Sequence, residues 1–161
     1  MKKFLFLLMA MIAFGFQSVN AQDGMKIVSN HPDFKIKVKR CAASGKTVII
    51  DLVLTNEGAT DIEKIEGGGG YWDSEAYDDE GNIYQYGDVK VRVANREEYE
   101  KNGCGEFKIP VGVPMKFSIS LENVPASAES IARLSLVFKC EKWSLNDDKP
   151  VKISNIPISR N

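Results

Sequence analysis

The residue types best suited to catalysis are few in this sequence and widely separated. The chain has 161 residues, with a single histidine, His31, and three cysteines, Cys41, Cys104 and Cys140. Histidine is the usual general base near neutral pH, and zinc sites need cysteines and histidines at short, regular spacing. One histidine and three scattered cysteines match neither pattern. The sequence therefore predicts no catalytic residue, no metal site and no cofactor.

Acidic residues gather around one turn, at Asp73, Glu75, Asp78, Asp79 and Glu80. Two carboxylates that hydrolyse a glycosidic bond lie on opposite sides of it, which side chains of one hairpin tip do not easily achieve. Calcium takes about six to eight oxygen ligands, and the spacing of Asp79-Glu80-Gly81 does not match an EF-hand loop. We interpret the cluster as a solvated turn. A calcium site assembled with other loops stays open as an alternative.

A run of four glycines, residues 67–70, is the most unusual local feature. Phosphate-binding loops are also glycine-rich, but they carry a Lys-Ser/Thr pair or lead into a helix. This run leads into Tyr71-Trp72 on a predicted strand, so nucleotide binding is not indicated. The run is either a flexible loop or a strand start that another backbone or a ligand approaches closely.

Aromatic residues follow the glycine run on two predicted hairpin strands. Exposed aromatic side chains can stack on sugars or anchor a protein partner. The predicted contact surface consists of Gly69, Gly70, Tyr71, Tyr84 and Tyr86. In the alternative interpretation, cross-strand tyrosine pairs stabilise the sheet and bind nothing. Trp72 alternates with Ser74 and Ala76, which favours a core position for its ring.

The elements that would position these residues are strands. Alternation of apolar and polar residues is typical of strands with one buried face, and it occurs in segments 34–38, 47–55, 71–77, 83–86, 89–93, 115–121, 134–140 and 150–158. We expect residues 61–66 to be a connection and residues 95–105 to include a helical turn. A change of apolar parity predicts a bulge near Asn155. About eight strands with turns at short spacing predict an all-β, antiparallel β-sandwich over residues 33–161.

The first 21 residues have the three parts of a secretory signal peptide. Lys2 and Lys3 precede an apolar stretch, residues 4–16, and Val19-Asn20-Ala21 offers a cleavage site. The stretch is shorter than the roughly 20 residues of a membrane span. We therefore expect export to the periplasm or the exterior, with no stable membrane insertion after cleavage. Residues 22–32 are expected to form a flexible leader.

Charge and cysteine content limit the partners. Cleavage would remove Lys2 and Lys3 and change the net charge from −1 to −3. Nucleic-acid binding requires a clustered positive face, so this balance argues against nucleic acid as a partner. Export permits a disulfide, and an odd count leaves one thiol over. Spacing does not choose among the three single bridges that Cys41, Cys104 and Cys140 allow.

Three segments together carry a family resemblance: Val53-Leu54-Thr55-Asn56, the turn from Asp78 to Tyr84, and Ile109-Pro110-Val111-Gly112-Val113-Pro114. In this order, and with the closing Asn155-Ile156-Pro157-Ile158, they resemble small secreted bacterial proteins with an immunoglobulin-like domain of the immunoprotective-extracellular type. The resemblance implies an immunoglobulin-like fold. It transfers no functional residue, because such families mostly lack a known activity.

The sequence thus predicts an exported, non-enzymatic domain that acts by surface contact with an unknown protein or glycan. A hydrolase that uses carboxylates alone is one alternative. Another is a structural envelope or assembly component that adds strands at an unpaired sheet edge.

Overall fold

The computed structural model describes residues 24–29, 33–67, 74–95, 106–140 and 151–160, which form strands and one short 3₁₀ turn. The strands are β1 (Lys26–Val28), β2 (Phe34–Ser44), β3 (Thr47–Asn56), β4 (Ile62–Gly67), β5 (Glu75–Asp78), β6 (Ile83–Gln85), β7 (Val89–Val93), β8 (Glu106–Ile109), β9 (Pro114–Leu121), β10 (Ser130–Leu136), β11 (Phe138–Cys140) and β12 (Val151–Pro157). The turn, η1, spans Tyr86–Asp88. The predicted signal peptide, His31 and the predicted helical turn lie outside the described residues.

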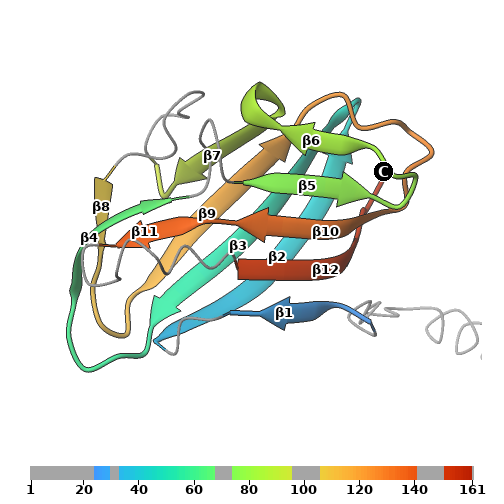
Figure 1. Cartoon of the computed structure of the whole chain (residues 1–161). Helices are drawn as coiled ribbons and strands as arrows, with labels where there is room; N and C mark the ends of the chain where they lie inside the picture. The colour runs from blue at the N-terminus through green and yellow to red at the C-terminus, as the bar shows by residue number, and fades with distance from the viewer. Residues whose placement is uncertain (1–23, 30–32, 68–73, 96–105, 141–150, 161) are drawn as a thin grey trace, which may run out of the picture.

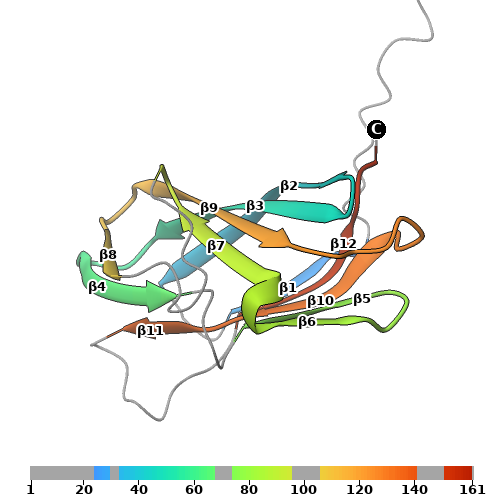
Figure 2. The same ribbon diagram turned by 90° about the horizontal axis from the view of Figure 1, so that it is seen from above.

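The strands form three antiparallel sheets. One sheet has the order β1-β12-β10-β5-β6, a second has the order β2-β3-β9-β7, and a third has the order β11-β4-β8. Figure 2 shows the first two sheets facing each other as two layers, with the third sheet at one end of the molecule. The prediction of an all-β, antiparallel fold is confirmed.

The β2–β3 hairpin shows how alternation specifies the larger elements. Val48, Ile50, Leu52 and Leu54 are fully buried, while the residues between them are half-buried. β3 lies between β2 and β9, so its outer-face side chains are partly covered by neighbours on both sides. Ser44 pairs with Thr47, which makes Gly45-Lys46 a two-residue turn with Gly45 at a φ of 60°.

The core lies between the sheets and extends to the end formed by the third. Phe117 of β9 contacts Phe138 of β11 and Phe107 of β8, with ring centroids 5.5 and 5.8 Å apart. Phe34 of β2 meets Phe138 edge-on at 6.1 Å. Aromatic pairs in such geometry add to the free energy gained by burial. These four rings join the third sheet to the β2-β3-β9-β7 sheet.

Three sequence predictions about individual segments are wrong. Residues 61–66, expected to be a connection, largely coincide with β4 (Ile62–Gly67), whose pairing with β8 shifts register between Ile62 and Ile65 and so breaks the two-residue pattern. Segment 134–140 is not one strand, since the chain leaves β10 at Val137 and continues as β11 in another sheet. The expected flexible leader includes β1, which pairs with β12.

The parity change in the last strand occurs where the sequence places it, but the β10–β12 ladder keeps one register across it. Ile153 and Ile156 are both buried, and between them Asn155 has a φ of 58°. Ile131 pairs with Ile156, and Leu134 pairs with Ile153. The irregularity lies on the other side of β10, where pairing with β5 shifts between Ile131 and Arg133. A left-handed residue in β12, which asparagine tolerates better than most residues, therefore replaces the expected bulge in this ladder.

Candidate functional site

The contact surface predicted from the sequence lies partly outside the described residues. Gly69, Gly70 and Tyr71 fall in the segment 68–73, and Trp72 falls there as well. Tyr86 begins η1. Tyr84 belongs to β6 and is only 4 % exposed. The prediction that Tyr84 is an exposed contact residue is therefore wrong.

Hairpin register explains the burial of Tyr84. Tyr84 pairs with Ala76 across the β5–β6 hairpin, and Ala76 is fully buried. The small methyl group on one strand leaves space for the ring on the other. Ile83, one residue earlier, points outward and is 55 % exposed. The last paired residues are Tyr77 and Ile83, so the five-residue loop 78–82 sets the register that turns Tyr84 inward.

Asp78 is the centre of a hydrogen-bond network that closes this hairpin. It is 3 % exposed, and its carboxylate accepts hydrogen bonds from Glu80 N (3.0 Å), Asn82 N (2.8 Å), Asn82 Nδ2 (2.9 Å) and Tyr84 Oη (2.7 Å). Four donors occupy both oxygens of the carboxylate. The acidic turn that suggested calcium from the sequence is thus organised around donors of the chain itself.

The network also shifts the pKa values of the Asp78 carboxyl group and the Tyr84 hydroxyl group. Burial raises the pKa of Asp78, but hydrogen bonds from Asn82, Tyr84 and the backbone outweigh it and hold the pKa below its usual range. Burial and the hydrogen bond to Asp78 raise the pKa of Tyr84. Asp78 is therefore a carboxylate and Tyr84 a neutral donor throughout the neutral range, and their hydrogen bond stabilises the turn.

The outer face of the same hairpin carries a second cluster, centred on Glu75. The carboxylate accepts hydrogen bonds from Tyr77 Oη (2.9 Å), Gln85 Nε2 (3.2 Å) and Arg133 (3.2 Å). The Arg133 guanidinium lies over the Tyr77 ring, 4.3 Å from its centroid. Such contacts cover the tyrosine with a cation, so this face presents a satisfied polar cluster.

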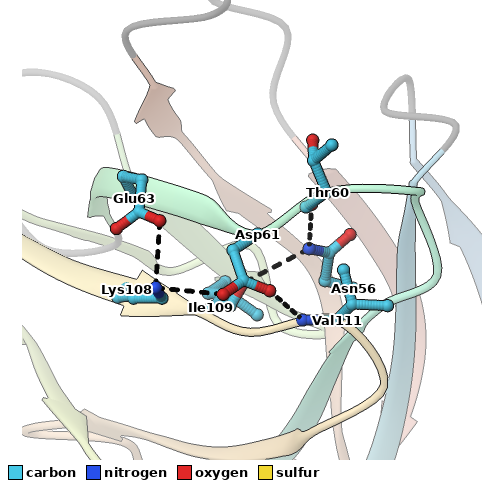
Figure 3. Close-up of polar contacts among 7 residues, drawn as sticks. All are labelled: Asn56, Thr60, Asp61, Glu63, Lys108, Ile109 and Val111. Carbon is cyan, nitrogen blue, oxygen red and sulfur yellow. Dashed lines mark hydrogen bonds and ion pairs between the residues drawn. The ribbon is translucent and has the colours of Figure 1, made fainter.

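At the opposite end of the molecule, a buried asparagine holds the loop between β8 and β9, residues 110–113. Asn56 occupies the next inward position of β3 after Leu54 and is fully buried. Its Nδ2 donates to the carbonyl oxygens of Thr60 (2.9 Å) and Ile109 (3.2 Å) (Figure 3). Its Oδ1 accepts from Gly58 N at 2.9 Å. Its backbone carbonyl accepts from Gly112 N at 2.8 Å. One residue thus fixes both the β3–β4 connection and the β8–β9 loop.

Two glycines permit this arrangement. A Cβ at Gly58 would lie 3.0 Å from Asn56 Oδ1 and 2.9 Å from Asp33 Cγ, closer than side chains tolerate. Gly112 has a φ of 71°, a conformation that costs glycine little. Asn56 and the segment Ile109–Pro114, which carry part of the family resemblance, are therefore in direct contact, and the sequence analysis missed Asn56 as a site residue. Its parity with Val48, Ile50, Leu52 and Leu54 is the signal that could have found it.

Charged side chains lie beside this loop. Asp61 Oδ1 accepts from Val111 N at 2.9 Å, and Asp61 Oδ2 lies 3.0 Å from Lys108 Nζ (Figure 3). The same ammonium lies 2.9 Å from Glu63 Oε1. These hydrogen bonds raise the pKa of Lys108, so the group stays charged. Asp61 joins the ion cluster to the backbone of the loop.

The loop itself presents apolar side chains to solvent. Val111 is 42 % exposed and Val113 is 44 % exposed, between Pro110 and Pro114. The amide of Val113 also bonds back to the Pro110 carbonyl. The candidate site, which we call the β8–β9 tip, consists of Val111 and Val113 with the flanking charges Asp61, Glu63 and Lys108. The site offers a rigid apolar surface bordered by acidic and basic side chains.

Cys41, the one cysteine whose side chain the structure describes, is not poised to act as a nucleophile. Cys41 is a free, buried thiol, and burial raises its pKa to about 12, against a smaller lowering by the charge of Arg160. A thiol of this kind is unreactive at neutral pH. A free Cys41 excludes the two predicted bridges that involve it, and Cys104, a member of the third, lies outside the described residues. In the described ranges, no three Asp, Glu, His or Cys side chains are grouped to hold a metal ion.

Comparisons with known proteins include a distant likeness to a solved structure. No family model matches the sequence, and no curated protein is detectably similar to it. Among solved structures, a family 123 glycoside hydrolase from Clostridium perfringens, studied for glycolipid glycan hydrolysis, is similar at 12 % identity and a TM-score of 0.41. The likeness covers 85 % of this chain and 26 % of that one. This chain therefore spans about a quarter of the hydrolase, and a similarity so low carries no argument about activity.

Across the ranges that the structure describes, no helix has the length and apolarity to cross a bilayer.

Proposed function

We propose that the protein is an exported, non-enzymatic domain with an immunoglobulin-like β-sandwich fold, which binds a partner protein through the β8–β9 tip. Two facing antiparallel sheets with a core between them support the sandwich (Figure 2). The apolar segment after Lys2 and Lys3 supports export. Contact with a partner rests on the geometry of the tip.

The observation that carries the proposal is an apolar tip held on a fixed backbone. Val111 N bonds to Asp61, Gly112 N bonds to Asn56 and Val113 N bonds to Pro110. A loop that is ordered before binding loses little conformational entropy when a partner covers it. Burying two exposed valines then contributes favourable free energy. Asp61, Glu63 and Lys108 lie at the rim, where charges select the partner and its orientation.

A protein fits this tip better than a glycan does. Sugar rings are bound mainly by stacking on aromatic faces, whereas the tip offers valine and proline side chains. Aliphatic groups of this size match the apolar pockets of protein surfaces. The proposal therefore narrows the sequence-based expectation of protein or glycan to protein.

The proposed role as a non-enzyme is supported by how the charged groups are used. Asp61 and Glu63 share one ammonium, on Lys108, so they face a common cation rather than flank a substrate. The pKa of Asp51 is lowered, because hydrogen bonds from Ser118 and the charge of Arg40 outweigh the raising effect of burial. A general acid for glycoside hydrolysis needs the opposite direction.

The test replaces the two valines of the tip and compares this variant with one in which a third valine, of similar exposure, is replaced. Val111→Ser with Val113→Ser removes the apolar tip, and Val28→Ser on β1, where the valine is 41 % exposed, is the matched control. Immobilised protein is exposed to an envelope extract, and bound proteins are identified by mass spectrometry. We expect a partner retained by wild type and by the control to be reduced about tenfold or more by the tip variant. Stability should change by less than about 0.5 kcal/mol, because the replaced side chains are on the surface.

Two results would contradict this proposal. One is a partner that the Val28→Ser variant loses as strongly as the tip variant does, since the contact would then be a general property of exposed apolar groups. The other is a partner that both variants retain fully, which would move the contact surface elsewhere.

A further inference from the structure

The outer face of the β2-β3-β9-β7 sheet concentrates positive charge. Along β2, Lys35 and Lys37 alternate with the buried Phe34, Ile36 and Val38, so their side chains point away from the core. The same alternation on β7 and β9 directs further cations outward. Seven side chains contribute: Lys35, Lys37, Lys39, Arg40, Lys90, Arg92 and Lys116.

Strand register places these cations over the width of the sheet. Lys37 pairs with Val53, which pairs in turn with Lys116 on β9. Arg40 pairs with Asp51, Asp51 with Ser118, and Ser118 with Arg92 on β7. Strands lie about 4.8 Å apart and residues two apart on a strand about 6.6 Å apart. The cations of β2, β9 and β7 thus form a two-dimensional array across the four-stranded sheet, in which the outer face of β3 carries one charged residue, Asp51.

Acidic groups neutralise part of the array. Lys35 pairs with Glu57 at 2.9 Å and Arg40 with Asp51 at 2.9 Å. Lys90 pairs with Glu122 at the edge. The remaining cations, Lys37, Lys39, Arg92 and Lys116, are exposed. The face therefore keeps a positive excess although the chain as a whole carries a net charge of −1.

We propose that this face binds the surface of an anionic phospholipid bilayer. A planar array of lipid phosphates is complementary to cations spread over a sheet, and each lysine or arginine near such a surface adds to the attraction. The described outer-face positions of these four strands carry Lys, Arg, Ser, Thr, Asp, Ala, Ile, Val and Pro. Stacking platforms for sugars or bases would need aromatic side chains there, so the composition favours lipid over glycan or nucleic acid.

The inference goes beyond the proposed function and does not depend on it. The loop of the β8–β9 tip precedes β9 and lies at one end of the molecule (Figure 1). The cations are spread over the outer face of the β2-β3-β9-β7 sheet. Attachment through the face would hold the protein at the envelope and leave the tip available at the edge. Failure of either surface leaves the other testable, because the two sets of variants share no residue.

Vesicle co-sedimentation provides the test. Protein expressed from the full sequence is purified, its N-terminus is determined by mass spectrometry, and it is mixed with vesicles of phosphatidylcholine containing about 30 % phosphatidylglycerol or with phosphatidylcholine alone. The variant Lys37→Glu with Lys116→Glu reverses two exposed cations of the face. The matched control, Lys26→Glu with Lys152→Glu, makes the same change in net charge on β1 and β12 of the other large sheet.

We expect wild type to sediment with the anionic vesicles and not with the neutral ones, and to be released by about 0.5 M salt. The face variant should bind at least about tenfold more weakly, and the control should stay within about threefold of wild type. The separate variant Lys37→Arg with Lys116→Arg keeps both positive charges and should bind the anionic vesicles as wild type does. Urea unfolding of each variant verifies that the fold is retained.

Equal loss in the face variant and the control would overturn the proposal, since binding would then follow net charge and not this face. Absence of wild-type binding to anionic vesicles would overturn it as well. So would tighter binding to heparin or to single-stranded DNA than to vesicles, with the same dependence on Lys37 and Lys116, because the occupant would then be a soluble polyanion.

Discussion

The β5–β6 turn and the β8–β9 loop are organised in similar ways but differ in the groups that their buried polar residue binds. Each is organised by one buried polar residue, Asp78 in the first and Asn56 in the second. Asp78 accepts hydrogen bonds from its own turn and from Tyr84, so the polar groups of that turn are used internally. Asn56 binds only backbone groups around it, so the side chains of the loop remain free to point outward.

The comparison teaches that polar composition does not identify the exposed, available surface. The acidic turn has the residue types that attract functional interpretation, and the structure uses them to satisfy one another. The β8–β9 loop has no residue of evident chemistry, and it carries two exposed valines, Val111 and Val113. Availability depends on where the hydrogen bonds of each segment go.

Removing the Asp78 carboxylate should have the largest effect. Asp78→Ala deletes four hydrogen bonds and leaves the buried Tyr84 hydroxyl without its acceptor, so we expect unfolding to become easier by about 3 kcal/mol. Urea denaturation measures the change. Asp79→Ala is the matched control in the same turn, because Asp79 is exposed and accepts from Glu129 N at 3.2 Å. Equal losses in the two variants would show that the turn does not depend on the buried carboxylate.

Asn56→Ala should have a smaller effect on stability and a distinct effect on the loop. Three side-chain hydrogen bonds are lost, for an expected cost of about 2 kcal/mol. The hydrogen of the Gly112 amide should exchange with solvent faster, because loss of the Asn56 side chain loosens the β3–β4 connection and with it the Asn56 carbonyl that accepts from Gly112 N. Hydrogen exchange followed by mass spectrometry measures this. Binding at the tip should weaken as well. Asp78→Ala serves as the comparison: a loop perturbed as much by that variant would mean that the two regions are not independent.

Strand prediction from the sequence succeeded where a strand has one buried face and an unbroken ladder. The alternation located β3, β7 and β9 to within a few residues, and it found the start of β2, which continues to Ser44, beyond the predicted segment 34–38. β4 was missed because a register shift between Ile62 and Ile65 breaks its period. β1 has three residues and is defined by its partner β12 rather than by a pattern of its own. Alternation through Leu134, Leu136 and Phe138 gave no sign that the chain changes sheets at Val137.

Site prediction was harder, because it depends on pairs of residues distant in the sequence. The residues next to Tyr84 in the sequence favour an exposed side chain, whereas its pairing with Ala76 across the hairpin directs the side chain into the core. Asn56 and Ile109 lie 53 residues apart, and their hydrogen bond exists only once β3 and β8 are assembled. The parity of Asn56 could predict its burial. The identity of the loop that it holds could not be predicted, because no local pattern specifies that contact.

The smallest effect is expected from titrating Asp78, because protonation leaves the side chain in place. Its folded-state pKa is lower than that of an ordinary aspartate, so its contribution to stability is fully present above the unfolded pKa of about 3.9 and is lost as pH falls through the folded value. The free energy of unfolding of wild type should therefore fall below about pH 4. In Asp78→Asn, which keeps an acceptor without a titrating proton, the fall should be shallower, with the residual slope coming from groups such as Asp51. Urea denaturation at a series of pH values measures both slopes, and parallel slopes would show that Asp78 has the same proton affinity in the folded and unfolded chains.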